Sequence, residues 1–93
     1  MAITHEMFEI DDSQAVAITP LQHAGRDITI QNLDGSGYLY IGGSNVTTTS
    51  FGYRIPPGSA WSIELRKDES VYAIGSTSVL VSVLYAGLES LNG

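Results

Sequence analysis

The stretch WSIELR, residues 61–66, alternates apolar and polar side chains without a break. A period of two places Trp61, Ile63 and Leu65 on one face of a β-strand and the polar residues on the other face. A strand with one buried and one solvated face is typical of an antiparallel sheet. The stretch therefore predicts an antiparallel β-domain and places Trp61 in its core.

Similar short runs of β-branched and aromatic residues lie on both sides of this strand, separated by Gly, Pro, Asn, Asp and Ser. The turn-forming residues 33–37 predict a hairpin between the first two runs. Residues 46–50 form either an edge strand or an exposed loop. The fold class that we expect is all-β, a small antiparallel β-sandwich or jelly-roll-like barrel of six to eight short strands. The expected strands are 27–33, 38–41, 51–55, 61–65, 70–74 and 79–85.

A chain of 93 residues is long enough for one domain. We expect this β-sandwich domain over residues 14–88. Residues 1–13 show no clear strand pattern and are expected to form an extended N-terminal arm, although an extra edge strand or a frayed terminus fits as well. Residues 89–93 are expected to form a C-terminal tail.

Charge and composition exclude several classes of partner. The net charge of -6 repels phosphate backbones, so we expect no nucleic acid partner. The longest apolar run, residues 79–84, is too short to span a bilayer, and we expect no membrane partner. Because cysteine is absent, no disulfide can staple this small core, which favours a reducing cytoplasm or stabilisation by self-association.

No group of residues has the spacing of an active site. His5 and His23 are too far apart in sequence to form a metal-binding pair, and no serine lies in a nucleophile elbow. Asp34 opens a loop that resembles half of a calcium site, but a turn is sufficient to explain it. We therefore expect no enzyme, no catalytic residues, no metal and no cofactor.

The last expected strand differs from the others because it is apolar on both faces. Its odd-numbered residues from Val79 to Tyr85 share one face, while Leu80 and Leu84 lie on the other. In so small a domain, the second face meets another chain or is covered by the N-terminal segment through Met7, Phe8 and Ile10. We expect the contact with another chain.

Two tyrosines of the expected strand 38–41 share one face of that strand. They could serve a protein interface or a glycan, or could pack in the core. The complete predicted interface consists of Val79, Leu80, Val81, Leu84, Tyr85, Met7, Phe8, Tyr38 and Tyr40.

Several runs of residues resemble a known class of proteins. ITIQN (28–32), YLYIGGSNVT (38–47), IPPGS (55–59), VYAIG (71–75) and the closing strand 79–84 together resemble small β-rich virion structural proteins of tailed bacteriophages. The resemblance covers about residues 27–86 and contains no catalytic signature. It implies a head-decoration, capsid-associated or tail-associated protein.

We therefore expect a structural virion protein that decorates or stabilises a phage capsid. It would self-associate, as a trimer or ring, and dock on major capsid or tail proteins, and it would be made in the host cytoplasm and be located in the virion. The alternatives are a carbohydrate- or receptor-binding β module and a tail or head–tail connector component.

Overall fold

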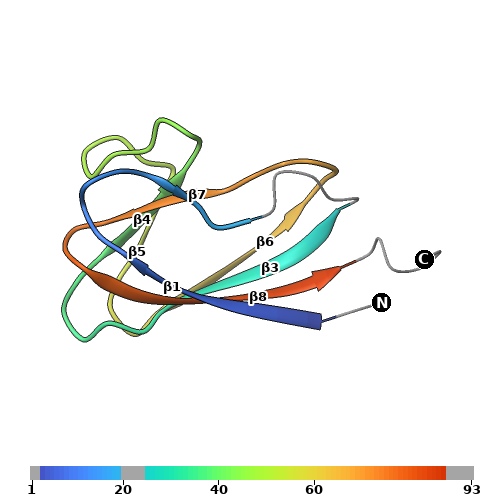
Figure 1. The fold of residues 1–93 in the computed structure, drawn as a ribbon, viewed down its shortest axis with the longest axis horizontal. Helices are drawn as coiled ribbons and strands as arrows, with labels where there is room; N and C mark the ends of the chain where they lie inside the picture. Colours follow the sequence, from blue (N-terminus) through green and yellow to red (C-terminus); the bar gives the residue numbers. More distant parts are fainter. Residues whose placement is uncertain (1–2, 20–24, 88–93) are drawn as a thin grey trace.

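The computed structural model describes residues 3–19 and 25–87. They form two antiparallel four-stranded sheets that face each other (Figure 1). The predicted tail, residues 89–93, and His23 lie outside the described residues. In chain order the strands are β1 (Ile3–Ile10), β2 (Val16–Ala17), β3 (Arg26–Asn32), β4 (Leu39–Gly42), β5 (Tyr53–Ile55), β6 (Ala60–Leu65), β7 (Tyr72–Gly75) and β8 (Val79–Gly87).

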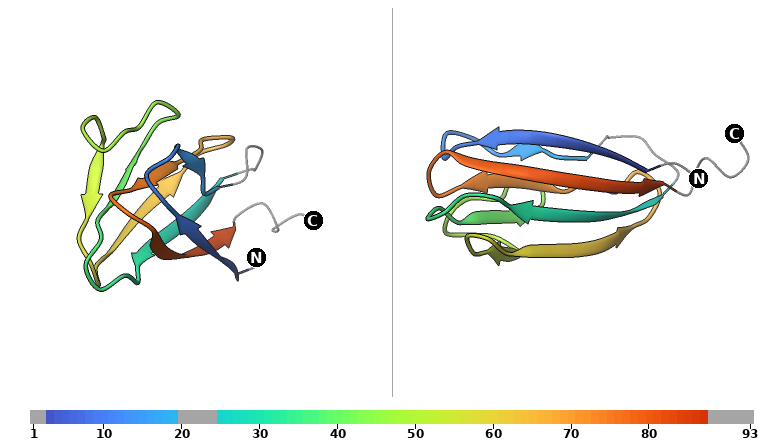
Figure 2. Two further views of the ribbon diagram at one scale, coloured as in Figure 1. Left: turned by 60° about the vertical axis from the view of Figure 1, so that its left-hand side comes forward. Right: turned by 90° about the horizontal axis from the view of Figure 1, so that it is seen from below.

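The two sheets differ in strand length. One sheet has the order β1-β8-β3-β6 and contains the long strands, so we call it the long sheet (Figure 2, right). The other, the short sheet, has the order β2-β7-β4-β5. The first strand pairs with the last, β2 with β7, β3 with β6, and β4 with β5, so the chain is one long hairpin folded over itself. This arrangement is a jelly roll, and it confirms the expected fold class.

The core lies between the inward faces of the two sheets. Ile28 and Ile30 of β3 and Val81 of β8 face Leu39 and Ile41 of β4, and all five side chains are buried. The strict alternation of buried and exposed residues in β3 and β8 follows from this packing. The strands that carry this alternation in sequence are the ones that the sequence predicts correctly.

The predicted hairpin over residues 33–37 is wrong. The two strands that flank it, β3 and β4, belong to different sheets, so this loop crosses from one layer of the sandwich to the other. The loop is an arch because β3 and β4 pack their apolar faces against each other across the sandwich. Two strands that are neighbours in one sheet do not pack face to face. Residues 46–50 form a loop between β4 and β5, which was one of the two expected alternatives, and Val46 at its start is buried while the residues after it are exposed or partly exposed.

Asn32 joins the two sheets at this arch. Its side chain is fully buried, and its Nδ2 donates to the carbonyl oxygens of Gly37 (2.9 Å) and Ile55 (3.0 Å). Its Oδ1 accepts from the backbone N–H of Asp34 (2.9 Å). One side chain therefore ties the end of β3 to the arch and to strand β5 of the short sheet.

The N-terminal segment is a strand and not a detached arm. Residues 3–10 form β1, which pairs with β8 along its whole length, from Ile3 opposite Ala86 to Ile10 opposite Val79. Of the alternatives left open by the sequence, the extra edge strand is the one in the structure. Met7 therefore lies beside the last strand and does not cover its outer face.

Candidate interaction surfaces

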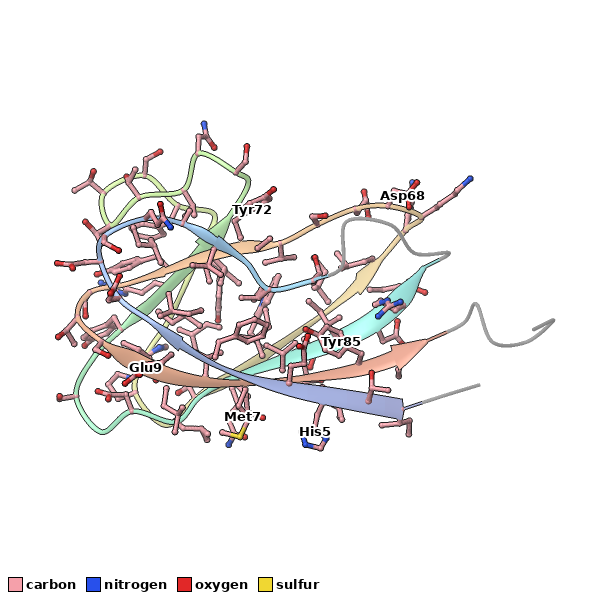
Figure 3. All side chains as sticks on the ribbon, viewed as in Figure 1. His5, Met7, Glu9, Asp68, Tyr72 and Tyr85 are labelled. Atoms are coloured by element: carbon pink, nitrogen blue, oxygen red, sulfur yellow. The ribbon has the colours of Figure 1, made fainter. Side chains whose placement is uncertain are left out.

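The outer face of the long sheet carries exposed apolar side chains. Leu80 and Leu84 of β8 are 44% and 45% exposed, and Met7 and Ile3 of β1 are 53% and 68% exposed. Figure 3 shows His5 and Met7 pointing away from the interior. His5 lies opposite Leu84, and Met7 lies opposite Ser82 between the two leucines. Within the described residues, no part of the chain covers this face.

Three of the predicted interface residues lie in the interior. Val79 and Val81 are fully buried and Tyr85 is 3% exposed, so their side chains pack against the opposite sheet. The expectation that they contact another chain is wrong, because these odd-numbered positions face the core. Of the predicted β8 residues, only Leu80 and Leu84 are available to a partner.

Tyr85 is anchored inside the sandwich, where Figure 3 shows it pointing inward. Its hydroxyl donates to the carbonyl oxygen of Ile18 at 2.6 Å and also lies 3.3 Å from Oε1 of Glu6. Burial, followed by the negative charge of Glu6, raises the pKa of the Tyr85 hydroxyl well above its usual value. The contact ties β8 and β1 to the segment after β2.

The other predicted residues are divided between core and surface. Phe8 is partly buried and packs against the core. Tyr38 and Tyr40 lie on the outer face of the short sheet, opposite the buried Leu39 and Ile41. The Tyr38 ring lies under the guanidinium of Arg54 (5.0 Å), and the Tyr40 ring packs against Phe51 (4.7 Å between centroids). Both tyrosines are thus held by neighbouring side chains on a surface and are separate from the β8 residues.

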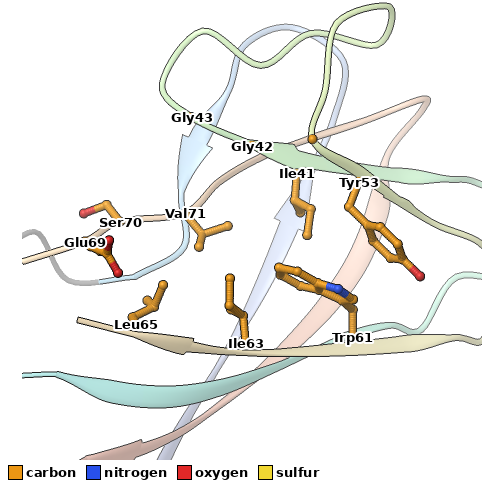
Figure 4. A pocket seen from close by; sticks show the side chains of 11 residues that line it. Ile41, Gly42, Gly43, Tyr53, Trp61, Ile63, Leu65, Glu69, Ser70 and Val71 are labelled. Atoms are coloured by element: carbon orange, nitrogen blue, oxygen red, sulfur yellow. The ribbon is translucent and has the colours of Figure 1, made fainter.

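A groove of about 500 Å³ opens between the two sheets along β6. Its floor consists of the inward side chains of β6, and Ile41, Tyr53 and Val71 of the opposite layer form its other wall (Figure 4). The Tyr53 and Trp61 rings stack at one end, with 5.3 Å between centroids and 23° between planes. The sequence placed Trp61 in the core, but it is only partly buried because β6 is an edge strand.

The groove exists because the short sheet ends early. The long-sheet edge strand β6 has 6 residues, whereas β5, the edge strand above it, has 3. Tyr53 therefore covers Trp61, but no β5 residue follows to cover Ile63, which stays partly buried, whereas Leu65 is buried in the core. Alternation in sequence predicts which face of a strand is apolar but not how far the opposite sheet extends, so sequence analysis missed this site.

Both edges of the long sheet are open to a further strand, and of the features that usually protect an edge strand they carry charged side chains alone, Glu6 and Glu9 on β1 and Glu64 on β6. Within the described residues, β1 pairs only with β8 and β6 pairs only with β3. Neither edge strand contains proline or lysine, and each follows its partner without a bulge. Edge strands in natural proteins commonly carry such features, since unpaired N–H and C=O groups invite pairing with another chain.

The polar clusters have structural explanations. The backbone N–H groups of Gly37 and Ser36 donate to the Asp34 carboxylate and lower the pKa of Asp34, as in a side-chain-capped turn. In the part of the chain that the structure describes, no three His, Cys, Asp or Glu side chains gather where they could hold a metal ion. No helix among those residues is long and apolar enough to cross a membrane.

The comparisons with known proteins show a similar fold in a solved structure. No family model matches the chain. No curated protein matches it either. A solved structure described by the words "Bacillus endospore appendages form a novel family of disulfide-linked pili" aligns with a TM-score of 0.51 and 13% sequence identity, covering 94% of this chain and 86% of that chain. At this identity the match shows a shared fold alone.

This neighbour contradicts the expected function. We expected a structural virion protein that decorates or stabilises a phage capsid, with a carbohydrate- or receptor-binding β module and a tail or head–tail connector component as the alternatives. The structure that shares the fold comes from a bacterial spore appendage and not from a virus particle. The virion function inferred from the resemblance of residues 27–86 is therefore corrected.

Proposed function

We propose that this protein is a structural subunit that assembles with copies of itself into an extended, pilus-like fibre. The observation that carries the proposal is the pair of open edges, β1 and β6, on opposite sides of one sheet within the described residues. An edge strand presents a row of backbone donors and acceptors to which another strand can add. A subunit with such edges on opposite sides can bind a neighbour on each side.

The fold neighbour supports the same role, because it is described as one of a family of disulfide-linked pili. The present 93 residues contain no cysteine, so contacts made by them are not linked by disulfides. Burial of apolar surface and pairing of strands then provide the free energy of association. The exposed Met7, Leu80 and Leu84 add apolar area beside the β1 edge.

Light scattering coupled to size-exclusion chromatography, with electron microscopy of the same sample, tests this proposal. We expect species larger than the 9.9 kDa monomer that grow with protein concentration, and extended particles in the images. A sample that stays monomeric at protein concentrations up to about 1 mM would overturn the proposal, because subunits with a dissociation constant above about 1 mM would not assemble at those concentrations.

A lysine on the edge gives the matched variant. Ser62→Lys places a charge on the exposed face of β6, whereas Ser44→Lys makes the same change in the exposed loop that follows β4. We expect Ser62→Lys to reduce assembly and Ser44→Lys to leave it unchanged, because edge lysines oppose strand addition. Circular dichroism of both variants checks that the β-structure is retained.

A further inference from the structure

We propose that the groove beside β6 receives strand β1 of a second copy, which adds to the long sheet and places Phe8 between the two layers. The inference rests on the proposed function and specifies which edges meet. It follows from the direction of the strands, the shape of the groove and the side chains on the inward face of β1.

The strand directions fit this contact. Each neighbour in the order β1-β8-β3-β6 is antiparallel, so β1 and β6 run in opposite directions. If a second copy is related to the first by a sideways translation, without a two-fold rotation, its β1 therefore lies antiparallel to β6 of the first copy. The short sheet obeys the same rule, because β2 and β5 also run in opposite directions. One displacement thus continues both sheets.

The groove lacks the apolar cover that β1 can supply. Tyr53 covers Trp61, while Ile63 is only partly buried and lines the open part of the groove. On β1 the inward face carries Phe8, which is only partly buried within its own chain. With Phe8 of the second copy opposite Ile63, its ring enters the part of the groove where β5 has ended.

The same register fixes the neighbours of Glu6 and Met7. When Phe8 lies opposite Ile63, the alternation of an antiparallel pair places Glu6 opposite Leu65 on the inward face. Glu6 keeps the Tyr85 hydroxyl of its own chain as a hydrogen-bond donor there, at 3.3 Å. On the outer face, Met7 of the second copy lies opposite Glu64.

Pairing of identical edges explains the groove less well. Two β6 strands related by a two-fold axis would bring two grooves together without a side chain to fill either. Two β1 strands would bring Glu6 and Glu9 of both copies to one contact and leave both grooves open. The contact between β1 and β6 is therefore the one that the geometry favours.

Single cysteines test which edges meet, because the chain has no cysteine of its own. We would prepare Met7→Cys and Glu64→Cys, both at exposed positions of the outer face, and Ser44→Cys in the loop as a control. Each variant alone, and the equal mixture of the first two, is treated with a short bis-maleimide. The linked peptides are identified by mass spectrometry.

We expect links between positions 7 and 64 in the mixture and loss of these links when either partner is replaced by Ser44→Cys. Assembly that yields mainly 7–7 or 64–64 links, or no links, overturns this inference and leaves the proposed function standing. A monomer with no links in any sample overturns both.

Trp61 provides a second measurement, since it is the single tryptophan of the chain and lines the groove. Covering by the second copy should shift its emission to shorter wavelength and reduce its quenching by acrylamide as the protein assembles. Assembly with unchanged emission and unchanged quenching would show that the groove stays open, and would contradict the inference.

Discussion

Replacement of Asn32 tests how the two sheets are held together. Its side chain makes three hydrogen bonds in the interior, two to the carbonyl oxygens of Gly37 and Ile55 and one to the N–H of Asp34. Asn32→Ala removes all three and leaves these backbone groups without that partner. Because Ile55 belongs to β5, the change also loosens the strand that forms one wall of the groove.

The magnitude follows from the number of bonds. Each buried hydrogen bond contributes about 1 kcal/mol net, and a buried group left unsatisfied costs about 1 to 3 kcal/mol. We therefore expect Asn32→Ala to lower the free energy of unfolding by about 3 to 5 kcal/mol. That is a large part of the roughly 5 to 15 kcal/mol of a typical domain, and it corresponds to a fall in Tm of about 12 °C or more.

Urea unfolding followed by Trp61 fluorescence and by circular dichroism measures this loss, at one protein concentration for all variants. Gln31→Ala, the exposed neighbour on the same strand, serves as the control and should change the free energy of unfolding by less than about 0.5 kcal/mol. Asn32→Leu keeps a similar volume but loses all three bonds, so it separates hydrogen bonding from cavity formation. A loss below about 1 kcal/mol for Asn32→Ala would refute the role of this side chain.

Four further outcomes are expected. A Cβ at Gly75 would overlap the carbonyl oxygens of Thr77 and Ile10, so Gly75→Ala should cost about 3 kcal/mol or more in urea unfolding, whereas Gly35→Ala, with open space around it, should be neutral. Leu84→Asp should retain the β-sheet signal in circular dichroism because Leu84 is exposed, while Val81→Asp should unfold the protein by burying a charge. The folded protein raises the pKa of Tyr85 above the usual value of 10.0, so the stability that comes from the neutral hydroxyl is fully present below about pH 10 and is lost as the pH rises towards the raised pKa. The urea midpoint should therefore be lower at about pH 11 than at about pH 8, and the difference should be smaller in Tyr85→Phe. Because each copy carries a net charge of -6, light scattering should show more assembly at about 1 M than at about 0.01 M salt, and the opposite trend would indicate that attraction between charges drives the contact.

The sequence predicted three strands of the long sheet well and the edge strand β1 poorly. In β3 and β6 apolar and polar residues alternate, so the period of two is visible, and β8 is recognisable as a run of mostly apolar residues rich in valine. In β1 the outer face carries Ile3 and Met7 and the inner face carries Glu6, so the alternation disappears. The hairpin predicted between β3 and β4 was wrong for a related reason, since turn-forming residues fit an arch between sheets as well as a turn within one sheet.

The features that escaped sequence analysis are the ones on which the proposed contacts depend. Strand β1 keeps unpaired backbone groups and part of its apolar surface exposed, and for that reason it does not show the alternation of a half-buried strand. Strand β6 does alternate like a core strand, but Trp61 is only partly buried and Ile63 lies beyond the end of β5. In the sequence, the last strand indicated a surplus of apolar surface at Leu80 and Leu84, and these two residues do lie exposed on the long sheet. The edges of that sheet became visible only when the pairing of all its strands was known.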